Sequence, residues 1–142
     1  MEEKFKDVKK ERVCSVVLGL IGCILGIILC VAYIKEIITI SYFLYLLIIM
    51  GLIVVIMYSY IMFARIRRYY KYKEYIGNRK QVKVEDLKSL FKKQKIKRLV
   101  VSDLEYYIKK GWLIQGHLVD IRRLLIMDDV SYNKYMEKME RE

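Results

Sequence analysis

The chain has 142 residues, a formal net charge of +11 from 27 Lys and Arg against 16 Asp and Glu, 56% hydrophobic residues and no proline. A chain of this length has room for one modest soluble domain at most, which excludes a large enzyme fold. The apolar residues are concentrated near the N-terminus, where residues 13–34 and 37–64 contain no charged residue. The composition therefore indicates two apolar segments followed by a small domain.

Residues 13–34 are predicted to form the first of two helices that span the bilayer. A helix needs about 20 apolar residues to cross a hydrocarbon core about 30 Å thick. This segment is apolar on every side, whereas a helix of a soluble core normally keeps a polar face. Residues 1–12 are expected to form a cytoplasmic tail. We expect no signal-peptide cleavage, because this tail carries four acids and no small-residue cleavage site follows the apolar run.

Residues 42–64 are predicted to form the second span, joined to the first by a short outer loop at residues 35–41. Lys and Arg are frequent before the first span and after the second, whereas the loop contributes only Lys35. Positive residues close to a span resist translocation, so both termini are expected to be cytoplasmic. The prediction is a multi-pass protein of the plasma membrane with a transmembrane helical hairpin over residues 13–64.

A stripe of small residues in the first span is expected to pack against another helix. Small side chains let helix backbones approach closely in lipid. Two neighbours remain open, the second span of the same chain, which we favour, and the same face of a second copy in a homodimer. All three cysteines of the chain lie in this span, and we interpret them as packing residues rather than metal ligands. The residues of the stripe are Gly19, Gly22, Cys23, Gly26 and Cys30.

Positive charge is concentrated in residues 65–110, which hold 16 Lys and Arg against 5 acids. Cations next to a span gain about 1 kcal/mol each from anionic lipid, so the cluster directly after the second span is interpreted as a contact with headgroups. A second basic cluster is assigned to the membrane surface or to an acidic partner. The residues of the two clusters are Arg65, Arg67, Arg68, Lys71 and Lys73, and Lys92, Lys93, Lys95, Lys97 and Arg98.

Residues 65–128 are predicted to form a juxtamembrane helix and a compact α+β domain. The juxtamembrane helix is expected to stop at Gly77 and Asn78, and apolar spacing predicts a short helix over residues 85–93. The next helix is predicted to begin at a capping box, in which Ser102 caps the first turn and Glu105 returns a bond. This helix is expected to stop at Gly111, to bury Val101, Leu104 and Ile108, and to expose Asp103, Tyr106, Tyr107 and Lys110.

Two strands are predicted after that helix, over residues 112–119 and 124–127, with residues 120–123 as the turn of a hairpin. Helix, turn, helix and β-hairpin is the order of a winged helix, provided that the juxtamembrane helix supplies the first helix. Residues 129–142 are expected to form a C-terminal tail with some helical character. The predicted fold is a two-helix transmembrane hairpin followed by a small α+β winged-helix-like cytoplasmic domain.

Four motifs of the predicted domain follow the pattern of a known family, and they are Val84-Glu85-Asp86-Leu87, Val101-Ser102-Asp103-Leu104, Ile108-Lys109-Lys110-Gly111-Trp112 and Gly116-His117-Leu118-Val119-Asp120. With them, residues 70–128 resemble the PCI-like winged-helix module of two-span membrane proteins of Gram-positive bacteria, a family whose role is largely uncharacterised. The chain departs from the family pattern at Tyr107, at Trp112 and at Leu118-Val119, all of which keep the apolar character of the residues that they replace. The resemblance implies an anchored winged helix and brings no catalytic residues.

The sequence shows no residue set that points to catalysis, to a cofactor or to a metal site. His117 is the single histidine, the cysteines lie in the first span, and no glycine-rich phosphate loop is present. We interpret His117 as a structural residue of the wing strand. The protein is therefore expected not to be an enzyme and to need no cofactor.

Two functions remain open. The first, which we favour, is a membrane-anchored protein-interaction module, a scaffold or adaptor for an unidentified cytoplasmic protein. The second is a membrane-tethered nucleic-acid-binding regulator, motivated by the +10 charge of residues 65–142, with 21 Lys and Arg against 11 acids. Our preference rests on Asp103 and Glu105, two acids that are expected to face phosphate at the end of a helix where a DNA reader contacts the groove.

Overall fold

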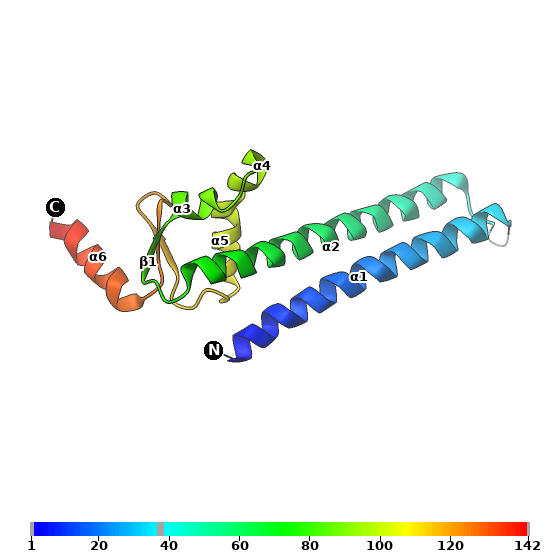
Figure 1. Ribbon diagram of the computed structural model, residues 1–142. Coiled ribbons are helices and arrows are strands. Elements are labelled where there is room, and N and C mark those ends of the chain that lie inside the picture. The colour runs from blue at the N-terminus through cyan, green and yellow to red at the C-terminus, as the bar shows by residue number, and fades with distance from the viewer. Residues whose placement is uncertain (1, 37–38, 142) are drawn as a thin grey trace. The chain divides into compact units, whose positions relative to one another are not determined.

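The computed structural model describes residues 2–36 and 39–141, so residues 37 and 38 of the predicted outer loop lie outside the described chain. The chain divides into two compact units, and the boundary falls between Ile66 and Arg67, within one long helix. The elements, drawn in Figure 1, are α1 (Glu2–Ile34), α2 (Tyr42–Ile76), β1 (Gln81–Lys83), α3 (Val84–Ser89), α4 (Gln94–Lys97), α5 (Val100–Lys109), β2 (His117–Val119), β3 (Leu124–Ile126) and α6 (Asp129–Arg141).

The first unit is a pair of long helices, α1 and the greater part of α2, which lie side by side and run in opposite directions (Figure 1). Both are long and apolar enough to cross a membrane, over Lys6–Ile34 and Tyr42–Ile76. Only 11% and 6% of the residues in their most apolar windows are buried, whereas the core helix of a soluble protein is mostly buried. The prediction of two long apolar helices near the N-terminus is confirmed.

The helix α2 ends where the sequence predicts that the juxtamembrane helix stops. The helix ends at Ile76, and Gly77 follows with φ +49°, a left-handed conformation that glycine adopts without strain. The Gly77 N–H donates to the Lys73 carbonyl at 3.0 Å, which satisfies one of the last free carbonyls of the helix. The part of α2 from Arg67 to Ile76 is the first helix of the second unit.

A three-stranded antiparallel sheet lies in the second unit, with the strand order β1-β3-β2. Val82 of β1 pairs with Leu125 of the central strand β3, and Leu118 of β2 pairs with Leu125 from the other side. The hairpin of β2 and β3 was predicted, although β2 is only His117–Val119 and residues 112–116 are not strand. The strand β1 was not predicted. This strand lies between α2 and α3 in the chain. The second unit is thus a small helix-rich domain with a three-stranded sheet.

The turn between β2 and β3, which we call the β2–β3 turn, consists of Asp120, Ile121 and Arg122. Its three residues have φ values of 53°, 52° and 65°, a left-handed region that side chains other than glycine rarely enter. The Arg123 N–H closes the turn by donating to the carbonyls of Val119 at 3.2 Å and Asp120 at 3.1 Å. The backbone thus holds the Ile121 side chain in solvent, where it is 89% exposed.

The helix α5 corrects two predictions. It begins at Val100 rather than at a capping box, because α4 ends only three residues earlier and Leu99 takes the N-cap position without a side-chain bond. Ser102 and Glu105 therefore lie inside the helix. The predicted exposure of Asp103 and Tyr107 is also wrong, since both are fully buried.

The core of the second unit gathers apolar side chains from the last turns of α2, from α3, from α5 and from the sheet. Two neighbouring residues of the strand β3, Leu125 and Ile126, are fully buried in this core. The helix α6, in contrast, has no buried residue. The buried apolar residues of this unit are Tyr69, Tyr72, Ile76, Val82, Val84, Leu87, Phe91, Val100, Leu104, Tyr107, Trp112, Leu113, Leu125 and Ile126.

Candidate functional site

A buried ion pair joins α2 to α5 inside the second unit. Arg68 Nε donates to Asp103 Oδ2 at 2.6 Å, and Arg68 Nη2 donates to Asp103 Oδ1 at 3.0 Å. The Tyr72 hydroxyl donates to the same carboxylate at 3.2 Å. This two-pronged geometry is the strongest that a guanidinium and a carboxylate can form. Arg68 therefore serves the fold, and its charge is engaged inside the domain.

The surroundings of Asp103 shift the pKa values of Arg68 and Tyr72. Burial acts to lower the pKa of Arg68, but the hydrogen bond and the negative charge of Asp103 outweigh it and raise that pKa. Burial, followed by the charge of Asp103, raises the pKa of the Tyr72 hydroxyl well above its ordinary value of 10.0. Arg68 therefore stays charged at neutral pH, and Tyr72 stays a neutral donor.

Aromatic rings link the last turns of α2 to α5 and to the segment after it. The rings of Tyr107 and Trp112 are stacked, with centroids 5.6 Å apart and planes 18° apart. Tyr69 meets both of them edge-on at 5.1 and 5.4 Å, and its hydroxyl donates to the Trp112 carbonyl at 3.2 Å. Such aromatic pairs add about 0.5–1.5 kcal/mol each to the burial of their surface.

The other cations of the two predicted clusters lie in different surroundings. In the first cluster Arg67 is exposed, and Lys71 Nζ lies 5.5 Å from the centroid of the Phe91 ring, which is a cation–π contact. In the second cluster Lys97 is half-buried, whereas the remaining members, Lys92, Lys93, Lys95 and Arg98, are exposed. The structure thus places the second cluster on the surface around α4.

A groove lies between α3, α4 and the first turn of α5, and we call it the α3–α5 groove. Its volume is about 520 Å³. Lys88 Nζ binds Glu85 Oε1 at 2.7 Å, whereas the described chain records no ion pair for Lys97 or Arg98. The groove is therefore lined by more positive than negative charge. Its lining residues are Glu85, Lys88, Ser89, Gln94, Lys97, Arg98 and Val101.

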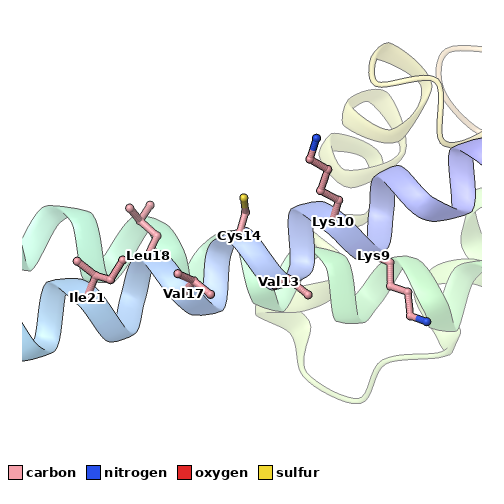
Figure 2. A pocket seen from close by; sticks show the side chains of 7 residues that line it. All are labelled: Lys9, Lys10, Val13, Cys14, Val17, Leu18 and Ile21. Carbon is pink, nitrogen blue, oxygen red and sulfur yellow. The ribbon is translucent and has the colours of Figure 1, made fainter.

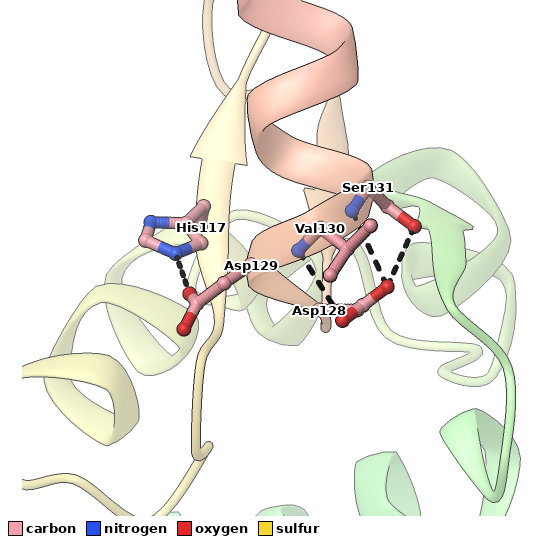
Figure 3. A network of polar contacts seen from close by, with 5 residues as sticks. All are labelled: His117, Asp128, Asp129, Val130 and Ser131. Atoms are coloured by element: carbon pink, nitrogen blue, oxygen red, sulfur yellow. Dashed lines mark hydrogen bonds and ion pairs between the residues drawn. The ribbon is translucent and has the colours of Figure 1, made fainter.

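Polar contacts at the start of α6 cap the helix and attach it to β2 of the sheet, as Figure 3 shows. Asp128 caps the helix by accepting from the Ser131 hydroxyl at 2.9 Å and from the backbone N–H groups of Ser131 and Val130 at 3.3 and 3.4 Å. His117 Nε2 lies 2.9 Å from Asp129 Oδ1, and the His117 ring stacks on Tyr132 with centroids 4.0 Å apart. His117 therefore joins β2 to the first turn of α6.

In the first unit, part of the small-residue stripe faces α2 of the same chain. A β-carbon added at Gly22 would lie 3.1 Å from Ile56 Cγ1, and one added at Gly19 would lie 3.3 Å from Ser59 Cβ. Cys30 Sγ accepts a hydrogen bond from the Tyr45 hydroxyl at 3.3 Å. The exception is Cys23, which is exposed.

Another face of α1 carries a shallow apolar groove with two lysines at one end (Figure 2). The side chains that Figure 2 labels all come from this one helix. The groove is lined by Lys9, Lys10, Val13, Cys14, Val17, Leu18 and Ile21.

Comparison of the chain with models of known protein families finds no matching family, and searches of curated proteins and of solved structures find no match either. The resemblance to PCI-like modules therefore stays a prediction. Over residues 2–36 and 39–141, no three His, Cys, Asp or Glu side chains come together in a way that could hold a metal ion.

Proposed function

We propose that the chain is a membrane-anchored protein-interaction module, a scaffold or adaptor. In this proposal α1 and α2 cross the plasma membrane as a hairpin with both termini in the cytoplasm, and the second unit presents a surface to a cytoplasmic protein. The length and apolar character of the two helices support the membrane location. The distribution of Lys and Arg supports the orientation.

A winged-helix fold for the second unit is part of the proposal. The order of elements supports it, because the end of α2, β1, α3, α5 and the hairpin of β2 and β3 follow one another as the parts of a winged helix do. The position of β1 adds to this, since it lies between the first two helices and completes the sheet beside β3. Fold alone does not define function, so the function has to rest on a surface.

The observation that carries the interaction function is the exposed apolar face of α6. This helix of 13 residues is amphipathic and has no buried residue. Met136 and Met139 are three positions apart and share one side of the helix, and they are 39% and 55% exposed. A helix of this length is only marginally stable without tertiary contacts, and amphipathic helices commonly bind partners through their apolar face. Methionine suits such a face, because its side chain adapts to irregular surfaces.

A photo-crosslinking amino acid placed at Met136 of the full chain tests this function in native membranes. Lys134 is the matched control position, since it is exposed and lies on a different side of the same helix. We expect a protein adduct of discrete mass from position 136 and background only from position 134. Equal patterns at the two positions, or no adduct at either, would contradict the interaction module.

The membrane orientation has its own test. Asn133 is exposed, and an engineered cysteine at this position, in a chain whose three native cysteines are replaced, reports which side of the membrane α6 occupies. We expect a membrane-impermeant thiol reagent to label it only after cells are opened. Labelling in intact cells would contradict the cytoplasmic location.

A membrane-tethered nucleic-acid-binding regulator is the second candidate, and the geometry of α5 favours it more than the sequence did. Asp103 is buried against Arg68 and does not face solvent. Glu105 stays exposed but is paired with Arg122 of the β2–β3 turn at 3.0 Å. Each of the two acids that argued against phosphate contacts therefore has a cationic partner within the domain. A steep salt dependence of duplex DNA binding by the full chain, with discrimination between sequences, would support this candidate over the first.

A further inference from the structure

The α3–α5 groove has positive charge that the domain itself does not neutralise. Lys88 is engaged by Glu85, whereas Lys97 and Arg98 line the groove with no ion pair recorded in the described chain. We propose that this groove binds the phosphate group of an anionic phospholipid headgroup, with Arg98 and Lys97 as the residues that hold its oxygens. This inference rests on the membrane location proposed above and adds a specific lipid site to it.

The chemistry of the lining matches a phosphodiester. An arginine fork and a lysine ammonium form charge-assisted hydrogen bonds with phosphate oxygens, and these are about twice as strong as neutral ones. The Gln94 amide supplies further donors, and Val101 adds an apolar wall. The volume of about 520 Å³ lies in the range of about 300–1,000 Å³ that is usual for small-molecule sites, so a headgroup fits.

A lipid is the favoured source of the phosphate because of how the domain is connected. The helix α2 carries an apolar segment long enough for a membrane and continues without a break to Ile76, and the groove begins at α3 only a few residues later. Tethering to a bilayer gives headgroups a high effective concentration near the domain. Phosphates of nucleic acid share the chemistry but lack this tether.

Two double variants of the full chain with the same change in net charge test the site. Lys97→Gln with Arg98→Gln removes the two groove cations, and Lys92→Gln with Lys95→Gln removes two exposed cations of the same segment that do not line the groove. Native mass spectrometry counts the phosphatidylglycerol molecules that each chain retains during a lipid titration. We expect the groove variant to bind one retained lipid about tenfold more weakly, which corresponds to about 1.4 kcal/mol. The control variant should match the parent chain.

Further arms of the experiment separate the sources of phosphate. Glycerol 3-phosphate tests a free phosphate, and a short DNA duplex tests nucleic acid. Equal lipid retention by the two double variants would overturn the groove site, because diffuse electrostatic attraction does not distinguish them. Tighter binding of DNA or of glycerol phosphate than of lipid, lost only in the groove variant, would overturn the lipid source.

The membrane location is tested separately by alkaline carbonate. Extraction of the chain from membranes would overturn both the location and the lipid site. Resistance to extraction, together with equal lipid retention by the two double variants, would overturn the lipid site alone. Unchanged near-ultraviolet circular dichroism of the groove variant is the control for folding.

Discussion

Arg68 and Asp103 are 35 residues apart in sequence, and their side chains form two hydrogen bonds of 2.6 and 3.0 Å within the second unit. The Asp103 side chain is fully buried, and that of Arg68 is 14% exposed. Removing one partner of such a pair is costly, because the other charge is left without compensation in a medium of low polarity. The pair therefore links the last turns of α2 to α5 in one arrangement.

Replacing the carboxylate tests this link. Asp103→Asn leaves the Arg68 guanidinium without its counter-charge, and we expect a loss of about 3 kcal/mol in the free energy of unfolding of the second unit. Chemical denaturation followed by near-ultraviolet circular dichroism of Trp112 measures it. Glu85→Gln is the control, since the Glu85 side chain is 73% exposed and its pair with Lys88 contributes less than about 1 kcal/mol. Equal losses in the two variants would contradict the role of the pair.

The raised pKa of Tyr72 predicts a loss of stability in alkali. Below pH 10 the hydroxyl is protonated in both the folded and the unfolded states, so its contribution is fully present. Above pH 10.0 the unfolded phenol ionises first, because its pKa is the lower one, and stability is lost. We expect Tyr72→Phe to show a smaller loss above pH 10 than the parent chain. Tyr135→Phe in α6 is the control, and it should lose stability above pH 10 as the parent chain does. A control whose stability depends on pH as little as that of Tyr72→Phe would contradict the prediction.

The contact between α1 and α2 is tested by two glycines that both lie inside long helices but differ in their neighbours. Gly22→Ile places its β-carbon 3.1 Å from Ile56 Cγ1, so the Ile56 side chain must shift to make room, whereas Gly51 has no neighbour within 4 Å of an added β-carbon. We expect Gly22→Ile to lower the stability of the hairpin by about 1–3 kcal/mol and Gly51→Ile to have much less effect. Thermal unfolding in detergent measures the difference. A lower mass in detergent for Gly22→Ile would instead assign this face to a homodimer.

The cap of α6 should control the order of that helix. Asp128→Ala removes the acceptor of three hydrogen bonds, and we expect the first turn of the helix to be destabilised, seen as faster hydrogen exchange of the α6 amides. The bonds from Ser131 lower the pKa of Asp128 below its ordinary value of 3.8, so the cap persists to acid pH and is lost as the pH falls further. Asn133→Ala, in the middle of the helix, should leave exchange unchanged or slow it. Faster exchange in both variants would contradict the capping role.

Local signals in the sequence were reliable where the structure depends on neighbouring residues. The two apolar helices follow from runs of apolar residues, and the stop of α2 follows from Gly77. The hairpin of β2 and β3 was also found, because both strands and their turn are contiguous. The strand β1 was missed, since it has one buried residue, Val82, and acquires its partner from a segment more than 40 residues later.

The buried ion pair shows why the candidate site was harder to predict. The apolar stripe of α5 was placed on Val101, Leu104 and Ile108, whereas the buried stripe runs through Val100, Leu104 and Tyr107. Asp103 lies on this second stripe. Because the sequence does not reveal its partner Arg68, its charge led to the prediction that it is exposed. Nothing local to Arg68 identifies that partner. The one signal that could have indicated a buried pair is a charged residue among apolar neighbours at helical spacing.

The β2–β3 turn gives the domain a site at which its sequence can change at little cost. Left-handed φ values cost side chains such as that of Ile121 about 1 kcal/mol or more, so a glycine would relieve strain there. Because Ile121 is 89% exposed, its replacement removes no packing from the core. Insertions between β2 and β3 would lengthen a loop whose closure entropy rises only slowly with length. Variation among relatives of this chain, and any peptide tag inserted by an experimenter, should therefore be tolerated best at this turn.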